Sequence, residues 1–308
     1  MRFNEDAQLD TSQVEDLRSG GGGGLGGRVA LGGGGISVVG VIVYVLFSLL
    51  GGGGGVPSGL GDGLGGVGSG QTADNSALEQ ACRTGADANA SQDCRIVAVI
   101  NSIQAYWRDQ FARSGQTYQV APTNFFRGSV DTACGGATSA VGPFYCPGDN
   151  EVYIDLDFFD ELRTKFGATG NEFVEAYVLA HEYGHHVQNL LGTSDRVDSR
   201  ETGPTSGAVR LELQADCYAG SWTNHATTIP AANGQPLIVE LTQQDIDGAL
   251  DAASRIGDDY IQRELGGGQV NPDAFTHGTS AQRQQWFRTG AETGEPGRCN
   301  TFDTNDLG

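Results

Sequence analysis

The sequence predicts an α+β fold that is mainly helical with a small sheet, behind an N-terminal transmembrane helix and a glycine-rich linker. Three observations support this prediction. Several stretches place apolar residues at helical spacing, whereas residues 152–156 alternate as a half-buried strand does. Residues 29–50 carry no charge. Glycine accounts for 49 of 308 residues, and much of that excess precedes residue 71, so it describes a linker and not a core.

The uncharged stretch 29–50 is long enough to cross a bilayer as one helix. Arg18 and Arg28 precede it, and the next basic residue is Arg83, so the positive-inside rule places the N-terminus in the cytoplasm. We therefore expect a cell-membrane protein with four parts in chain order. These are a short cytoplasmic segment (1–28), a transmembrane helix (29–50), a glycine-rich flexible linker (51–77) and an extracytoplasmic domain (78–308).

Two alternatives to a membrane anchor are weaker. A cleaved signal peptide should begin with a basic leader, but its apolar core would start late here and several acidic residues precede it: Glu5, Asp6, Asp10, Glu15 and Asp16. A buried helix of a globular domain is disfavoured because glycine runs flank the apolar stretch on both sides.

Charge and cysteine content agree with export. The net charge of −20 argues against nucleic acid and against an anionic membrane surface as partners. All six cysteines lie after residue 78, and an even number in an exported domain indicates disulfides, for which 15 pairings exist. The equal C-x11-C spacings predict local bonds, which leaves one long-range bond: Cys82–Cys94, Cys134–Cys146 and Cys217–Cys299. A second zinc site made of cysteines would need a C-x2-C spacing, which the chain lacks.

The elements of the large domain follow from apolar spacing and from helix-capping residues. In chain order we expect a helix over 96–113, a strand over 152–156, and helices over 158–166, 170–191, 206–225, from Thr242 to about Tyr260, and 279–290. Thr169 and Glu172 form a candidate capping box for the fourth of these elements, and Gly192 ends it.

The helix predicted over 170–191 carries His181-Glu182-Tyr183-Gly184-His185, which reads H-E-x-x-H. Residues four apart share one helix face, so His181 and His185 can offer two imidazoles to one ion. Glu182 lies where it can reach a water held by that ion, which is the arrangement that zinc-assisted hydrolysis requires. The alternative is a helix that merely carries histidines, but three of the five histidines in the chain fall within 181–186.

A catalytic zinc site needs a third protein ligand. Glu212 and Asp216 are four apart on the helix predicted over 206–225, beside an apolar stripe. Most such acidic pairs are solvated, and this pair alone would be interpreted in that way. With H-E-x-x-H upstream, we predict that Glu212 is the third zinc ligand and that Asp216 orients a ligating histidine.

These motifs resemble the gluzincin pattern, H-E-x-x-H followed by E-x-x-x-D. More closely, the chain resembles the bacterial putative neutral zinc metallopeptidase family of membrane-anchored proteins. The likeness includes GPFYCPGDNEVYIDLDFF (142–159), FTHGTSAQRQQWF (275–287) and SQVEDLR (12–18). It implies a zincin-like fold with zinc on His181, His185 and Glu212, and Glu182 as the catalytic residue. It also implies an edge strand that holds extended substrate. Residues 152–156 are a candidate for that strand or else an ordinary core strand.

His277 precedes the last predicted helix, and two interpretations remain open. It can donate to the oxyanion formed during carbonyl attack, or it can be a structural hydrogen-bonding residue. His186 and His225 are expected to be structural or solvated.

The expected reaction is hydrolysis of a peptide or protein substrate. Zinc lowers the pKa of a bound water, and Glu182 takes its proton and passes it to the leaving amine. Two other functions remain possible: a membrane-tethered zinc-binding scaffold without activity, and a zinc amidase that acts on cell-wall material.

Overall fold

A computed structural model describes residues 1–18, 72–168, 171–198, 201–231 and 234–308. The predicted transmembrane helix, nearly all of the predicted linker and Thr169 of the predicted capping box lie outside these residues. Within the described ranges, no helix combines the length and apolar character that a bilayer crossing needs.

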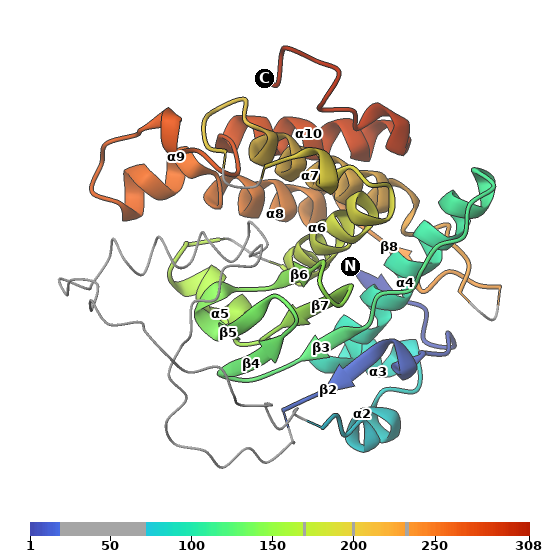
Figure 1. Ribbon diagram of the computed structural model, residues 1–308. Coiled ribbons are helices and arrows are strands. Elements are labelled where there is room, and N and C mark those ends of the chain that lie inside the picture. Colours follow the sequence, from blue (N-terminus) through green and yellow to red (C-terminus); the bar gives the residue numbers. More distant parts are fainter. Residues whose placement is uncertain (19–71, 169–170, 199–200, 232–233) are drawn as a thin grey trace.

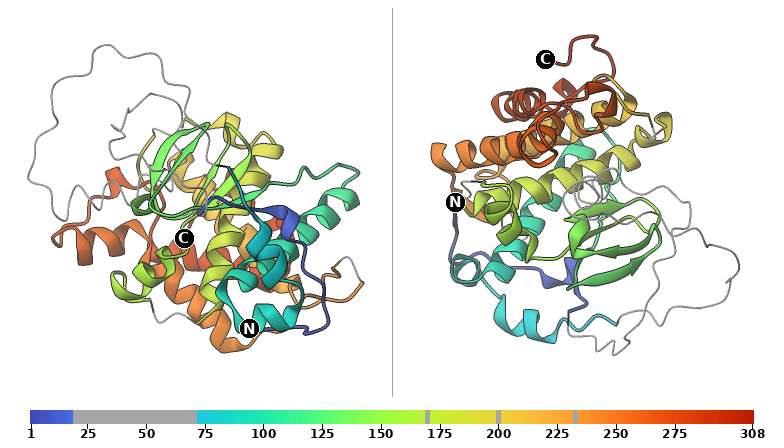
Figure 2. Two further views of the ribbon diagram at one scale, coloured as in Figure 1. Left: turned by 90° about the horizontal axis from the view of Figure 1, so that it is seen from below. Right: turned by 90° about the vertical axis from the view of Figure 1, so that its left-hand side faces the viewer.

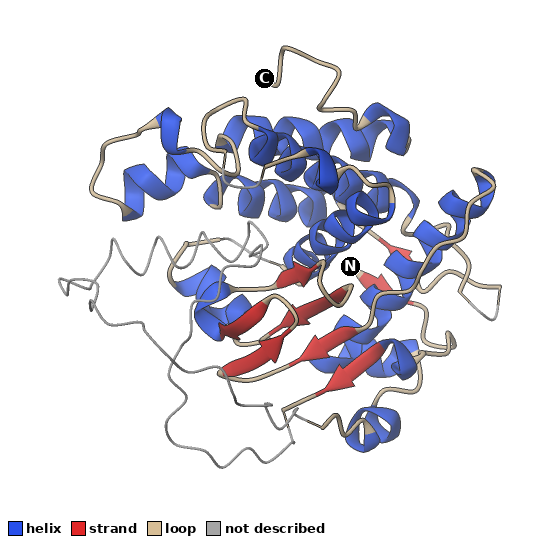
Figure 3. Ribbon diagram, in the orientation of Figure 1, coloured by secondary structure: helices blue, strands red, loops and turns tan. Residues whose placement is uncertain are grey.

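Helices dominate the fold, and most of the long ones gather on one side of the strands (Figures 1 and 3). The long helices are α4 (Gln92–Arg113), α6 (Phe173–Leu190), α7 (Gly207–His225), α8 (Gln243–Arg255) and α10 (Ser280–Thr293), and the short ones are α2 (Ser76–Ala81), α3 (Gly85–Ala90), α5 (Phe158–Thr164) and α9 (Asp258–Tyr260). The α+β prediction and the positions of the predicted helices are confirmed. Thr242 and Thr279 form the capping boxes of α8 and α10.

One predicted helix is shorter than expected. The helix that begins after Thr242 ends at Arg255 and does not run on to Tyr260. Gly257 explains the break, because a Cβ atom there would lie 2.4 Å from the backbone nitrogen of Ser280. The chain turns at this contact into α9 and a π-helical turn, Ile261–Leu265.

The main sheet has four strands in the order β2–β3–β7–β6, with bounds Val14–Asp16, Thr123–Phe125, Glu151–Ile154 and Phe144–Cys146. β2, β3 and β7 are parallel, and β6 is antiparallel to β7. Residues 152–154, within the candidate edge strand, therefore lie inside the sheet, and the edge-strand interpretation is wrong for them. The edge on that side is β6. Two smaller ladders pair β4 (Ser129–Thr132) with β5 (Gly135–Thr138) and β1 (Arg2–Phe3) with β8 (Ile238–Glu240).

The N-terminal 18 residues are built into this fold. β1 pairs with β8, β2 pairs with β3, and the side chains of Phe3 and Val14 are buried. The amide of Asn75 donates to the Val14 carbonyl and accepts from the Asp16 backbone nitrogen, so Asn75 lies beside β2. The folded part thus includes residues outside the expected range 78–308. A membrane between residues 1–18 and that range would separate all of these contacts.

The right-hand view of Figure 2 shows α6 between the green strands and the three helices α7, α8 and α10. Gly184 allows α6 to approach α7, because a Cβ there would lie 3.0 Å from the Cα of Ala215. The contacts at Gly220 of α7 and Gly290 of α10 are closer still. A Cβ on Gly220 would lie 2.1 Å from the Phe287 carbonyl oxygen, and a Cβ on Gly290 would lie 1.9 Å from the Cys217 carbonyl oxygen. Backbone contact between helices therefore fixes the relative positions of the side chains that α6, α7 and α10 contribute.

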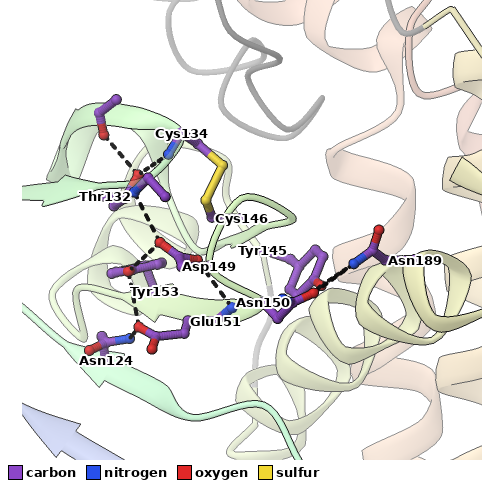
Figure 4. The surroundings of a disulfide bond; sticks show 12 residues. Asn124, Thr132, Cys134, Tyr145, Cys146, Asp149, Asn150, Glu151, Tyr153 and Asn189 are labelled. Carbon is purple, nitrogen blue, oxygen red and sulfur yellow. Dashed lines mark hydrogen bonds between the residues drawn. A yellow bond between two sulfur atoms is a disulfide. The ribbon is translucent and has the colours of Figure 1, made fainter. Parts of the chain in front are cut away.

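All three predicted disulfides are present: Cys82–Cys94, Cys134–Cys146 and Cys217–Cys299. The second joins β6 to the loop before β5 (Figure 4). Beside it, Asn189 near the end of α6 donates to the Tyr145 hydroxyl and to Asn150. These bonds hold the edge strand β6 against the helix that carries H-E-x-x-H.

Candidate metal centre

Three predicted ligands converge where α6 crosses α7. His181 and His185 lie one turn apart on α6, and α7 places Glu212 opposite them. The Nε2 atoms of the two histidines are 3.2 Å apart, and the Glu212 carboxylate oxygens lie 3.1 Å from Nε2 of His181 and 3.4 Å from Nε2 of His185. Among the described residues, this is the one group of His, Cys, Asp and Glu side chains arranged so that it could hold a metal ion.

The Nδ1 atom of each imidazole already has a hydrogen-bond partner. Nδ1–H of His181 donates to Asp216 over 2.9 Å, and Nδ1–H of His185 donates to Oε1 of Gln188 over 2.9 Å. The amide of Gln188 is fixed in turn because it donates to the Leu211 carbonyl and to Gln214. Both Nε2 lone pairs therefore point at the same spot. Such second partners set the tautomer of zinc-binding histidines.

The spacing of these atoms fits zinc. Zinc–nitrogen bonds of about 2.0–2.1 Å in a tetrahedral site place neighbouring ligand atoms roughly 3.3 Å apart. The separation of 3.2 Å between the two Nε2 atoms matches this value. A zinc ion between the two Nε2 atoms would accept a lone pair from each at that distance.

Buried polar atoms that lack partners point to the same place. Side-chain polar atoms in protein interiors nearly always have a hydrogen-bond partner. Five buried side-chain atoms among the described residues have none, and three of the five are Oε2 of Glu182, Oε1 of Glu212 and Nε2 of His277. An ion with its bound water would satisfy such groups.

Asp216 lies at the centre of a buried hydrogen-bond network that includes residues other than the predicted zinc ligands. It accepts from the Tyr177 hydroxyl over 2.6 Å and from Nε and Nη2 of Arg283 over 2.8 and 2.9 Å. Burial alone would raise the pKa of this carboxyl, but Arg283 and His181 outweigh burial and lower it to about 2. Asp216 is therefore ionised, as a carboxylate that orients His181 must be.

The ionisation of the ligands is set by their neighbours. Burial opposes the charged forms of both His181 and Glu212. The carboxylates of Asp216 and Glu212 nevertheless raise the pKa of His181 to about 10. The imidazoles of His185, His277 and His181 hold the pKa of Glu212 well below its usual value. Two buried carboxylates, those of Glu212 and Asp216, thus provide the negative charge that the centre offers to a cation.

Glu182 has the character of a base that works near neutral pH. Its side chain is buried, and burial raises its pKa to about 7 against the opposing effect of His181 and His185. A backbone hydrogen bond from Tyr145 of β6 stabilises its charged form. A carboxylate with a pKa near the working pH is well matched to proton transfer.

His277 reaches the centre from the loop before α10. Oδ2 of Asp258 accepts from the backbone nitrogens of Thr276, His277 and Gly278 over 2.8, 2.7 and 2.9 Å, which fixes this loop. The Nδ1 atom of His277 lies 2.7 Å from the Thr276 hydroxyl and 3.4 Å from Asp258. Its Nε2 atom has no partner, and its ring is close enough to lower the pKa of Glu212. The other two histidines hydrogen-bond elsewhere: His186 to Tyr145 and Gln119, and His225 to Ser221.

The structure brings together five of the predicted site residues: His181, Glu182, His185, Glu212 and Asp216. The sixth, His277, is close enough to affect the charge of Glu212. The sequence did not predict that Arg283, Asp258 and Gln188 support the centre. Gln188 is three residues after His185 on the same helix, which is a usable signal. Arg283 and Asp258 lie on other elements, and no local spacing connects them to the motif.

The centre has the side chains that are typical of zinc hydrolases. Two imidazoles and one carboxylate surround one point, and a second carboxylate lies beside them. The chain belongs to the family described as "putative neutral zinc metallopeptidase", whose model matches residues 1–302.

Relatives of the chain are found in distant bacteria. It is 49% identical over 228 residues to the uncharacterized protein Rv2575 of Mycobacterium tuberculosis, covering 74% of this chain and 76% of that protein. It is 44% identical over 209 residues to the uncharacterized protein YpfJ of Escherichia coli, covering 66% of this chain and 69% of that protein. No solved structure matches the chain.

Proposed function

We propose that the chain is a zinc-dependent metallopeptidase that hydrolyses peptide bonds. The observation that carries this proposal is the convergence of two Nε2 lone pairs and the Glu212 carboxylate, with each outer ring nitrogen already engaged. The buried Glu182 carboxylate on the same helix supplies the base that a hydrolase needs and a structural zinc site does not.

His181, His185 and Glu212 would hold the ion, which would supply a Lewis acid that acidifies water and polarises the substrate carbonyl. Glu182 accepts the proton of the attacking water and later delivers it to the leaving amine. The partnerless Nε2 of His277 is available to stabilise negative charge on the carbonyl oxygen.

We propose that the peptide substrate adds to β6 as a further strand, in a zincin-like arrangement. β6 is the edge strand on the side of α6, and its Tyr145 backbone touches Glu182. Extended peptides commonly bind to exposed sheet edges through main-chain hydrogen bonds. A substrate on β6 would therefore pass directly beside the catalytic carboxylate.

A non-catalytic zinc scaffold is disfavoured by the number of ligands. Structural zinc sites are closed by four protein ligands, whereas catalytic sites have three and keep one position open. The metal-binding group found among the described side chains has three members.

Substitution of Glu182 by Gln tests the proposal. Glu182→Gln should bind zinc as the wild type does and lose peptide hydrolysis by at least 10²-fold, because it removes the base and keeps the ligands. Glu292→Gln, on the exposed face of α10, is the matched control and should retain both properties. A Glu182→Gln protein that hydrolyses peptides at the wild-type rate would refute the assigned base.

We propose further that the folded domain works outside the cytoplasm, with residues 29–50 as its contact with the membrane. All six cysteines are paired, and disulfides of this kind persist in oxidising compartments. Because residues 1–18 pack into the domain, they belong on the same side of the membrane as residues 72–308. This replaces the expected arrangement, in which the N-terminus lies in the cytoplasm.

A further inference from the structure

A small cavity adjoins the metal centre. Its walls include His181, Glu182 and Glu212. A substrate side chain that enters the cavity would therefore belong to a residue next to the bond that is cleaved. The other walls come from four elements that meet here: Pro143 before β6, Tyr177 and Val178 of α6, Ile256 at the end of α8, and Arg283 of α10.

The polar groups in these additional walls are already engaged. The Tyr177 hydroxyl donates to Asp216, and the Arg283 guanidinium donates to Asp216 and to the Ile256 carbonyl. The charge of Arg283 is balanced by Asp216, so Arg283 offers no free cation to an acidic side chain. The side chains of Val178, Ile256 and Pro143 contain only carbon atoms. A polar side chain placed against these walls, away from the Glu182 and Glu212 carboxylates, would lose its water without gaining a partner, which is costly.

The size of the cavity sets an upper limit on what enters. Its volume is about 40 Å³. One water molecule needs roughly 10–15 Å³ on the same scale, so the cavity has room for about three or four heavy atoms. That is the size of a valine side chain. An aromatic ring would need the walls to move apart.

We propose that this cavity is the main specificity subsite, that it takes a small aliphatic side chain from one of the two residues flanking the cleaved bond, and that Val178 and Ile256 set its size. The proposal rests on the peptidase function proposed above. Aromatic side chains are excluded by volume, and acidic side chains by the Glu182 and Glu212 carboxylates in the walls and by the lack of a free cation. A misfit by a few methylene groups in an apolar pocket changes kcat/KM by tens of fold.

The first test compares cleavage of two peptides that differ only by valine or phenylalanine at the selected position, after a peptide-library digest has identified that position. The wild type should prefer valine by at least ten-fold in kcat/KM. Ile256→Ala, which widens the cavity, should reduce this preference at least ten-fold. Ile246→Ala, a similarly half-buried residue on α8 away from the cavity, is the matched control and should keep the wild-type preference.

A second test needs no turnover. Two dipeptide hydroxamates that differ only by valine or phenylalanine are titrated into the zinc-loaded protein by calorimetry. The valine compound should bind at least ten-fold more tightly, and Ile256→Ala should remove the difference. Equal binding of the two compounds, or equal effects of Ile256→Ala and Ile246→Ala, would overturn the specificity proposal. Failure of the protein to cleave any peptide would instead contradict the peptidase function, and the hydroxamate titration would still decide whether the cavity selects small side chains.

Discussion

At the scale of single residues, His181 is held by two carboxylates that favour a proton on it. Asp216 lies at Nδ1 and Glu212 at Nε2, and together they raise its pKa to about 10. A zinc ion needs the Nε2 lone pair, so it must displace the proton that these carboxylates stabilise. The same negative charge that binds the proton attracts the cation. Zinc affinity and protonation are therefore linked at this residue.

The linkage between protonation and zinc binding predicts how zinc affinity depends on pH. Because the pKa of His181 is raised, the ring is protonated at all pH values well below about 10, and zinc binding at pH 7 should release about one proton from it. Apparent zinc affinity should rise with pH across the neutral range. Calorimetric titration of the zinc-free protein in two buffers with different ionisation enthalpies measures the released protons directly. Identical binding enthalpies in the two buffers would show that no proton is displaced.

The residues of the centre differ in how far sequence could predict them. His181, Glu182 and His185 follow from spacing within one helix, and Glu212 and Asp216 from the same spacing on a second helix. Arg283 could not be found in this way, because its contact with Asp216 spans 67 positions and depends on how α10 packs against α7. The same holds for Asp258, which acts through three backbone nitrogens 18 to 20 residues away.

At the scale of elements, the crossing of α6 and α7 at Gly184 controls the metal centre. Gly184 lies inside H-E-x-x-H, directly before His185, and faces the backbone of Ala215. Separation of the two helices would move Glu212 away from both imidazoles.

Gly184→Val should therefore impair zinc binding and stability together. The added side chain overpacks the crossing, and we expect a loss of about 1–3 kcal/mol in the free energy of unfolding. Gly297→Val is a suitable control, because a Cβ at Gly297 meets no atom within 4 Å. Urea unfolding and zinc content measure the two effects. A Gly184→Val protein with wild-type stability and full zinc content would show that the helices tolerate separation.

The order of the strands in the sheet was harder to predict from the sequence than the positions of the helices. The alternation of residues 152–156 correctly located a strand, but alternation does not say which strands are neighbours. β6 was missed because three residues, Phe144–Cys146, are too few to show a period and all three are buried. The edge beside α6 became visible only from the pairing of β6 with β7.

At the scale of the whole molecule, the N-terminal 18 residues complete the fold. Their strands have two and three residues and pair with partners more than 100 positions away, so no local pattern indicates them. Charge bias around residues 29–50 instead suggested that residues 1–28 form a separate segment. The strand pairings of residues 1–18 join distant parts of the chain, and a single sequence does not reveal such contacts.

Phe3→Ala tests whether these residues support the domain. The Phe3 side chain is 1% exposed, and its truncation in a packed core should cost about 3–5 kcal/mol of unfolding free energy. Arg2→Ala removes an exposed ion pair with Glu240 and should cost only about 0–1 kcal/mol. Thermal or urea unfolding of the full chain distinguishes the two. Equal, small effects of both substitutions would mean that residues 1–18 do not pack on the domain.

Zinc K-edge absorption spectroscopy of the purified full chain, together with its metal content, tests the central claim most directly. We predict one zinc ion per chain, nitrogen and oxygen ligands at about 2.0–2.1 Å, two imidazole rings in the outer scattering and no sulfur ligand. Glu212→Ala should lose this signal, whereas Glu182→Gln should keep it. A protein without zinc, or a site closed by four protein ligands in the wild type, would contradict the assignment of His181, His185 and Glu212 as an open catalytic centre.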